Sequence, residues 1–102
     1  MNTHSRKERT LGMYRAVLTL QTVEEAMHFF DDLCTVSELR AMEQRFQVAE
    51  LLDEGLIYNE ILERTGASSA TISRVNRCLR YGADGYTAAL DRLREAGENE
   101  KT

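Results

Sequence analysis

The residues best suited to chemistry lie between positions 64 and 80, and the chemistry they suit is binding of nucleic acid. This window holds four arginines and no acidic residue, although the whole chain of 102 residues has a formal net charge of −4. Affinity for a polyanion depends on the charge of one local face rather than on the total. Residues 20–63, by contrast, carry a net charge of −9. A basic window in an acidic protein therefore predicts a localised DNA-binding surface.

Short side chains lie between these arginines and predict a surface that reads base edges. Small hydroxyl and methyl groups let a helix enter the major groove closely, where they can hydrogen-bond bases or meet a thymine methyl group. The arginines beside them suit phosphate contacts, which position a protein on the duplex. The residues predicted to contact double-stranded DNA are Ser68, Ser69, Ala70, Thr71, Ser73, Arg74 and Arg77.

A helix-turn-helix over residues 58–80 would position this surface. The pattern has a short helix around 59–64, then Gly66, which tolerates the positive φ of a sharp turn, then Ser68 as an N-cap. Ile72, Val75 and Leu79 form the buried stripe of the second helix. An ordinary helical hairpin with a solvated Ser/Thr face explains the glycine and the apolar spacing. It does not explain four arginines without an acid.

The rest of the chain predicts an all-α protein with about six helices in a single domain, residues 1–102. Proline is absent and strand-type alternation is absent. Three segments, 5–8, 22–25 and 35–38, fit the capping box, in which a hydroxyl residue is followed three positions later by Glu. We expect the other helices to begin near Ser5, Thr22, Thr35 and Tyr86. Their expected ends are about Leu20, residue 33, Gly55 and Ala96, and we expect the tail, 97–102, to fray.

The first two predicted helices, within residues 5–34, are expected to form a dimer interface. They carry Tyr14, Met27, Phe29 and Phe30 on more than one side, which is more apolar surface than terminal helices of a small core can cover. A second copy of the chain would bury this surface. The alternative is that both helices fold back onto the core of their own chain.

Other classes of function find little support in the sequence. The carboxylates occur as adjacent pairs typical of solvated helix surfaces, so we do not expect an enzyme. His4 and His28 have no cluster of further ligands, which speaks against a metal site. No apolar run predicts a membrane span, and we expect a cytoplasmic protein with Cys34 and Cys78 as buried thiols. Two alternatives remain open: a DNA-binding module with a replication or architectural role, and an adaptor that binds only protein.

Residues 65–74, TGASSATISR, resemble the helix-turn-helix of the Trp repressor superfamily. The extension over 75–82, VNRCLRYG, is similar to the Trp repressor-related YerC/YecD branch. Further matches lie at 33–38, at Arg45 and at 50–52, so the resemblance covers roughly residues 10–95. It implies an intertwined dimer and a transcriptional repressor that binds a double-stranded DNA operator.

The resemblance also implies a candidate effector pocket lined by Thr35, Arg45, Arg74 and Cys78. In the Trp repressor, two arginines sandwich the indole ring of the corepressor, and Arg45 and Arg74 match them in type. The repressor has glycine where this chain has Val75, and serine where it has Cys78. A branched side chain fills the space, and a thiol is a poor partner for an ammonium group. These changes count against tryptophan as corepressor and leave open another small molecule, or none.

Overall fold

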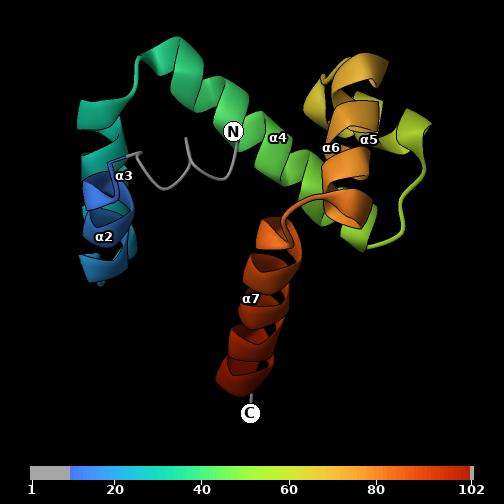
Figure 1. Cartoon of the computed structure of the whole chain (residues 1–102). Helices are drawn as coiled ribbons and strands as arrows, with labels where there is room; N and C mark the ends of the chain where they lie inside the picture. The colour runs from blue at the N-terminus through green and yellow to red at the C-terminus, as the bar shows by residue number, and fades with distance from the viewer. Residues whose placement is uncertain (1–9, 102) are drawn as a thin grey trace. The chain divides into compact units, whose positions relative to one another are not determined.

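A computed structural model describes the backbone of residues 10–101 and the side chains of residues 10–97. It holds six helices and no strand within that range, which confirms the all-α prediction. The helices are α2 (Gly12–Thr19), α3 (Val23–Leu33), α4 (Val36–Asp53), α5 (Tyr58–Thr65), α6 (Ser69–Tyr81) and α7 (Gly85–Lys101) (Figure 1).

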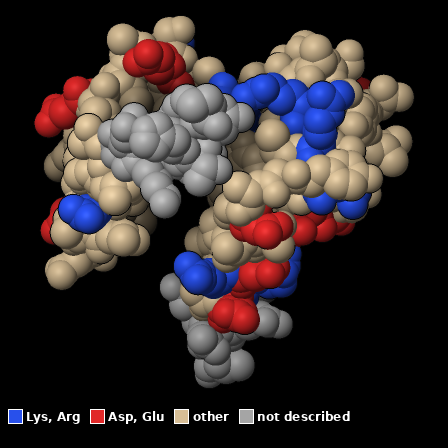
Figure 2. Space-filling view, in the orientation of Figure 1, with Lys and Arg blue, Asp and Glu red and all other residues tan. Residues whose placement is uncertain are grey.

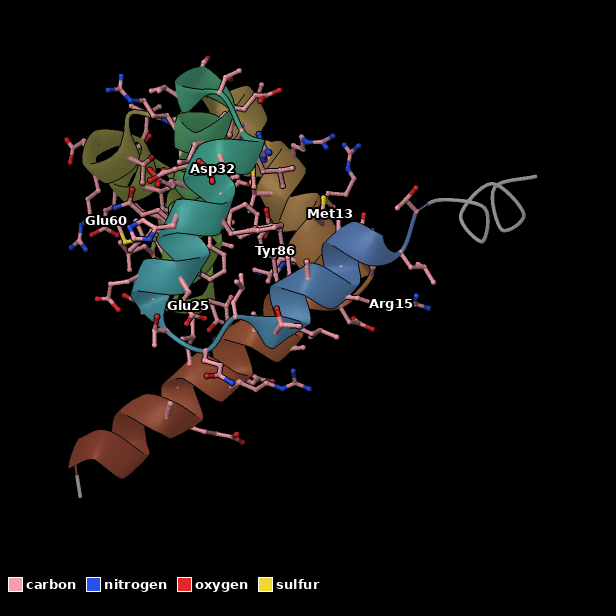
Figure 3. The ribbon with its side chains drawn as sticks, turned by 90° about the vertical axis from the view of Figure 1, so that its left-hand side faces the viewer. Met13, Arg15, Glu25, Asp32, Glu60 and Tyr86 are labelled. Atoms are coloured by element: carbon pink, nitrogen blue, oxygen red, sulfur yellow. The ribbon has the colours of Figure 1, made fainter. Side chains whose placement is uncertain are left out.

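The chain divides into two compact units, which are described separately: unit 1 extends to Leu39, and unit 2 begins at Arg40. The prediction of a single domain is not tested by this division. In unit 1, Thr22 caps α3, because its Oγ1 accepts a hydrogen bond from the backbone N–H of Glu25 at 3.0 Å. Figure 3 shows Glu25 at the start of α3 and Asp32 near its end.

A complete capping box opens α4. The Oγ1 of Thr35 accepts from the N–H of Glu38 at 3.1 Å, and the Glu38 carboxylate accepts from the N–H of Thr35 at 2.8 Å. This arrangement satisfies two backbone donors that a helix start leaves without intrahelical partners. The sequence signature at 35–38 is therefore confirmed in its atomic detail.

Unit 2 places three helices around the C-terminal part of α4. Helix α4 ends where Gly55 adopts a φ of +94°, with Leu56 donating to the carbonyl of Leu51 and Gly55 to that of Leu52. These two bonds form a Schellman motif. Helix α6 then packs against both α5 and α7, and α7 leads away from its end (Figure 1).

The buried core lies wholly in unit 2 as far as the described residues show. Its members come from α4, α5, α6, α7 and the turn before α6: Val48, Ala49, Leu51, Ile61, Ala67, Ile72, Val75 and Leu90. Ile72 and Val75 confirm the predicted stripe of α6, while Leu79 is half-buried. Unit 1 contains no buried residue between Thr10 and Leu39.

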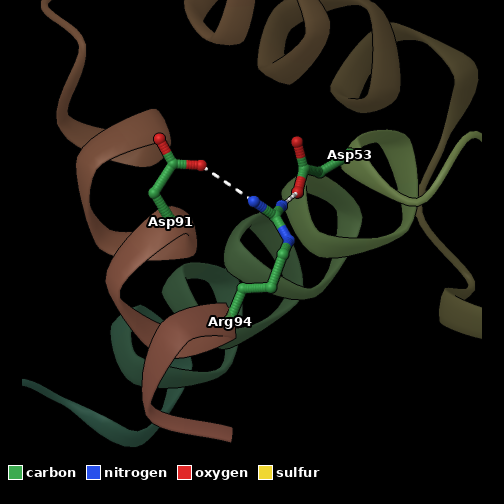
Figure 4. A network of polar contacts seen from close by, with 3 residues as sticks. All are labelled: Asp53, Asp91 and Arg94. Atoms are coloured by element: carbon green, nitrogen blue, oxygen red, sulfur yellow. Dashed lines mark hydrogen bonds and ion pairs between the residues drawn. The ribbon is translucent and has the colours of Figure 1, made fainter. Parts of the chain in front are cut away.

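Helix α7 is held to α4 by an aromatic contact and by an ion pair. The rings of Phe46 and Tyr86 lie 6.3 Å apart, and the Arg94 guanidinium bridges Asp53 on α4 and Asp91 on its own helix (Figure 4). The hydrogen bond to Asp91 and the charge of Asp53 raise the pKa of Arg94 above its ordinary value. Because the shift is upward, any stabilisation from it is present throughout the ordinary pH range and is lost only in strong alkali.

Two expectations about the elements are wrong. The first helix does not run continuously from Ser5 to Leu20: Thr10 and Leu11 are not helical and α2 begins at Gly12, while the signature at 5–8 lies outside the described residues. Helix α7 continues through 97–101, where we expected fraying. The segment holds Glu and Lys, which favour helix, and no proline.

The prediction that both cysteines are buried is also wrong. Cys78 is exposed on α6 and Cys34 is half-buried at the end of α3. Apolar periodicity assigns a residue to one side of a helix, but position 78 lies beyond the edge of the stripe formed by Ile72 and Val75. A cysteine is small enough to occupy either side.

Candidate nucleic-acid interface

Helix α6 has a buried face and an exposed face, and most of the predicted DNA contacts lie on the exposed one. Ile72 and Val75 are buried, and Thr71, Asn76 and Leu79 are half-buried. Exposed short side chains come first along the helix and exposed arginines follow from position 74: Ser69, Ala70, Ser73, Arg74, Arg77 and Arg80. Cys78 and Tyr81 are also exposed. With a rise of about 1.5 Å per residue, this surface extends over roughly 16 Å from Ser69 to Arg80.

The start of α6 is fixed by its own side chains. The Oγ of Ser68 accepts from the N–H of Thr71 at 3.1 Å and donates to the Oγ1 of Thr71 at 3.1 Å. Ser68 therefore acts as the N-cap that the sequence predicted. Both hydroxyls already have partners within the chain, and Thr71 is half-buried, so the structure favours Ser69, Ala70 and Ser73 as the more accessible groups for bases.

The turn before α6 is held by Gly66 and Thr65. Gly66 has a φ of +72°, the left-handed region that its sequence position predicted, and its N–H donates to the carbonyl of Leu62. Thr65 Oγ1 donates to the Ile61 carbonyl at 2.8 Å and accepts from the N–H of Ala67 at 3.0 Å. The Thr65 carbonyl also accepts a bond from the amide of Gln44 on α4, at 3.1 Å.

Basic side chains gather on the face of unit 2 that Figure 2 draws. There Lys and Arg lie over α4 and α6, and acidic side chains lie nearer α7. Arg74, Arg77 and Arg80 are all exposed on α6. Arg80 was not among the predicted contacts, although its spacing of three residues from Arg77 is the signal that places it on this face. Its charge in the last turn also complements the helix dipole.

The structure does not test whether the four residues of the candidate effector pocket lie side by side. Thr35 belongs to unit 1, so its place beside the others is not tested. In unit 2, Arg45 is half-buried on α4, while Arg74 and Cys78 are exposed on α6. Val75, between them, is only 1% exposed and belongs to the core cluster.

A groove of about 330 Å³ lies instead between α4 and α7. Its lining is Glu50, Asp53, Glu54, Leu90, Leu93 and Arg94. None of the predicted effector residues lines it. Three carboxylates and one arginine make it an acidic surface, and the arginine is already paired with Asp53. The groove is therefore part of the contact that holds α7 rather than part of the basic face.

Among the residues that the structure describes, no group of three or more His, Cys, Asp or Glu side chains is placed to hold a metal ion. None of the described helices combines the length and the apolar character needed to cross a membrane.

Comparison with known proteins gives a consistent result along nearly the whole chain. The uncharacterized protein YerC of Bacillus subtilis (strain 168) is 52% identical over 83 residues, which cover 81% of this chain and 80% of YerC. The crystal structure of a candidate Trp repressor from Staphylococcus aureus is 47% identical and superposes with a TM-score of 0.80. It covers 87% of this chain and 92% of that one.

A TrpR-like protein from Eubacterium eligens ATCC 27750 is equally similar, with 47% identity, a TM-score of 0.79, and coverage of 86% of this chain and 94% of that one. The sequence model of the Trp repressor protein family matches residues 9–94, which include α2 to α6 and most of α7. The family resemblance that residues 65–82 indicated is therefore confirmed, and the chain belongs to the Trp repressor protein family, a family of DNA-binding regulators.

Proposed function

We propose that this protein is a sequence-specific transcriptional repressor in the cytoplasm, which reads the major groove of an operator with α6. The observation that carries the proposal is the order of side chains along the exposed face of this helix. Short side chains at Ser69, Ala70 and Ser73 leave room for close approach to base edges, and Arg74 and Arg77 follow within one to two turns. The buried face of the same helix holds it against the core through Ile72 and Val75.

The first experiment is selection of duplexes from a random pool, followed by titration of the selected duplex over a range of salt concentrations. Each phosphate contact adds about 0.9 to the negative slope of log K against log salt, so Arg74→Ala should weaken binding and reduce that slope by about 1. The far-UV circular dichroism should not change, because Arg74 is exposed. Arg92→Ala on α7 is the matched control, since it removes the same charge from an exposed position outside α6.

The outcomes separate the proposal from its alternatives. If no duplex is selected and no salt-dependent binding of DNA is measured, the result would support an adaptor that binds only protein. Binding without sequence preference would support an architectural role. If a sequence is selected, a reporter gene placed behind it should be expressed more strongly when the protein is absent, because we propose a repressor. Lower expression in its absence would instead identify an activator.

We propose further that the protein works as a homodimer joined through unit 1. Helices α2 and α3 expose large apolar side chains, among them Leu18 at 84% and Val23 at 70%, and neither helix contains a buried residue. An apolar surface of this kind on a small unit is typical of an interface. Two copies of the chain would also present two recognition helices to two half-sites, which raises both affinity and specificity.

Tryptophan is not the effector in this proposal. Two observations support this view: the Val75 side chain is buried in the core, and Cys78 offers only a weakly accepting sulfur to the amine of an amino acid. Either another small molecule regulates the protein or none does. Calorimetric titration with tryptophan, and operator titration with and without it, test this part of the proposal separately from DNA binding.

A further inference from the structure

We propose that Gln44 is a positioning residue for DNA recognition: its side-chain amide holds the turn of the helix-turn-helix in register with α4. The inference rests on the proposed function, because its main consequence is an effect on operator affinity. Gln44 lies on α4, 21 positions before Thr65, and its Nε2 donates to the Thr65 carbonyl at 3.1 Å. Both residues belong to unit 2 and both are half-buried.

The Thr65 carbonyl needs a partner from outside its helix. Thr65 is the last residue of α5, and the final four carbonyls of a helix have no intrahelical donor. A carbonyl oxygen can only accept, so the Gln44 amide must present its NH₂ group, and the orientation of the side chain is thereby defined. The bond satisfies a half-buried acceptor that would otherwise lose its solvation without replacement.

The same residue organises the rest of the turn. Thr65 Oγ1 donates to the Ile61 carbonyl and accepts from Ala67, the residue directly before the N-cap of α6. A chain of directional bonds therefore runs from Gln44 through Thr65 to the start of the recognition helix. The core cluster that α6 shares with α5 and α4 is apolar, through residues such as Ile72, and apolar packing is non-directional. The bond from Gln44 is thus suited to set the angle at which α6 faces the duplex.

Gln44→Glu tests the proposal because it keeps the shape of the side chain and removes the donor. At pH 8 the carboxylate cannot donate to the carbonyl, the turn samples other orientations, and the apparent Kd rises in proportion to the loss of the competent state. We expect about a tenfold rise relative to Gln47→Glu, the value that corresponds to losing one such bond. Gln47 is exposed one turn further along α4, so that control adds the same charge without touching the turn.

The pH dependence separates positioning from a general loss of stability. A protonated carboxyl group can donate to Thr65, and an adjacent carbonyl oxygen disfavours the charged form. The ratio of the two apparent Kd values should therefore fall towards 1 between pH 8 and pH 5. Gln44→Met, which preserves side-chain length and has no donor, should lose affinity to a similar degree with no recovery at pH 5. If Gln44→Glu does not fold, the operator affinity of Gln44→Met still tests the role of Gln44.

Hydrogen exchange without DNA gives an independent measurement. The amide of Ala67 should exchange faster in both Gln44 variants than in Gln47→Glu, because its acceptor is no longer held in place. If the unaltered protein selects no duplex, the proposed function fails, while this exchange measurement still decides the role of Gln44. Equal operator affinities for the Gln44 and Gln47 variants, or unchanged exchange at Ala67, would overturn the inference.

Discussion

Substitution of Val75 tests whether its side chain stabilises the core or only fills the space of a ligand site. Its side chain is 1% exposed and belongs to the same buried cluster as Ile61 and Ile72. If this packing stabilises the fold, replacing Val75 with a smaller residue must lower the free energy of unfolding. If the side chain only fills a site that relatives keep open for a ligand, the same change should leave stability nearly unaltered and create a binding site.

The expected loss in the free energy of unfolding follows from the atoms that each substitution removes. Val75→Ala deletes two methyl groups, each contributing about 0.8 kcal/mol when buried, and the residual cavity brings the expected loss to about 2 kcal/mol per chain. Val75→Gly adds about 1 kcal/mol, because glycine has a low propensity for the interior of a helix. Cys78→Ser is the matched control on the same helix, and since position 78 is exposed we expect a change within about 0.5 kcal/mol.

Urea unfolding followed by circular dichroism measures these differences. All proteins must be compared at one concentration, because a dimer is more stable at higher concentration. With a slope of about 1.5 kcal/mol per molar urea, Val75→Ala should lower the midpoint by roughly 1.3 M. In parallel, calorimetry should detect no tryptophan binding to the unaltered protein, and the change Val75→Gly with Cys78→Ser should bind more than either single variant. An unchanged urea midpoint for Val75→Gly, together with saturable binding of tryptophan, would refute the assignment of Val75 to the core.

Two further predictions concern the proposed dimer and the end of α6. Leu18→Glu should dissociate the proposed dimer: burying two copies of a leucine contributes about 3–6 kcal/mol, so the dimer Kd should rise at least about a hundredfold. Analytical ultracentrifugation measures the dimer Kd of this variant and of the control Gln21→Glu, which adds the same charge to unit 1. Identical Kd values for the two variants would exclude an interface at Leu18. Gly82→Ala should lower the free energy of unfolding by about 1–3 kcal/mol, because the added Cβ would lie 2.3 Å from the carbonyl oxygen of Cys78. Gly85→Ala, where an added Cβ meets nothing within 4 Å, should leave thermal unfolding unchanged or raise its midpoint, and equal midpoints for the two variants would contradict the clash.

Much of the fold could be predicted from local signals, because helices begin and end through contacts between residues close in sequence. The hydroxyl residues Thr22, Thr35 and Ser68 cap helices as predicted, the first two from their spacing to a following Glu and Ser68 from its type and place after the turn. Gly66 adopts the positive φ that its place between two apolar patterns required. The start of α2 was harder to predict, because Leu11, its N-cap residue, forms no side-chain bond that a sequence pattern could reveal.

The site itself was predictable in its residue types and less so in its detail. The sequence predicted an outer face of short side chains and arginines on one helix, and the exposure of Ser69, Ala70, Arg74 and Arg77 agrees with that face. It did not show that Thr71 is half-buried and bonded to Ser68. The DNA contacts and the effector pocket stay predictions.

Local sequence alone determined where charge accumulates, which residues cap the helices and where the chain turns, because each of these depends on neighbours within about four positions. Contacts between distant residues were decided only by the tertiary structure. Gln44 meets the Thr65 carbonyl, and Arg94 pairs with Asp53, across 21 and 41 positions respectively. No periodic pattern encodes such pairs, because they arise only when packing of the apolar faces brings two helices together. The same packing places Val75 in the core and leaves Cys78, three residues later, in solvent.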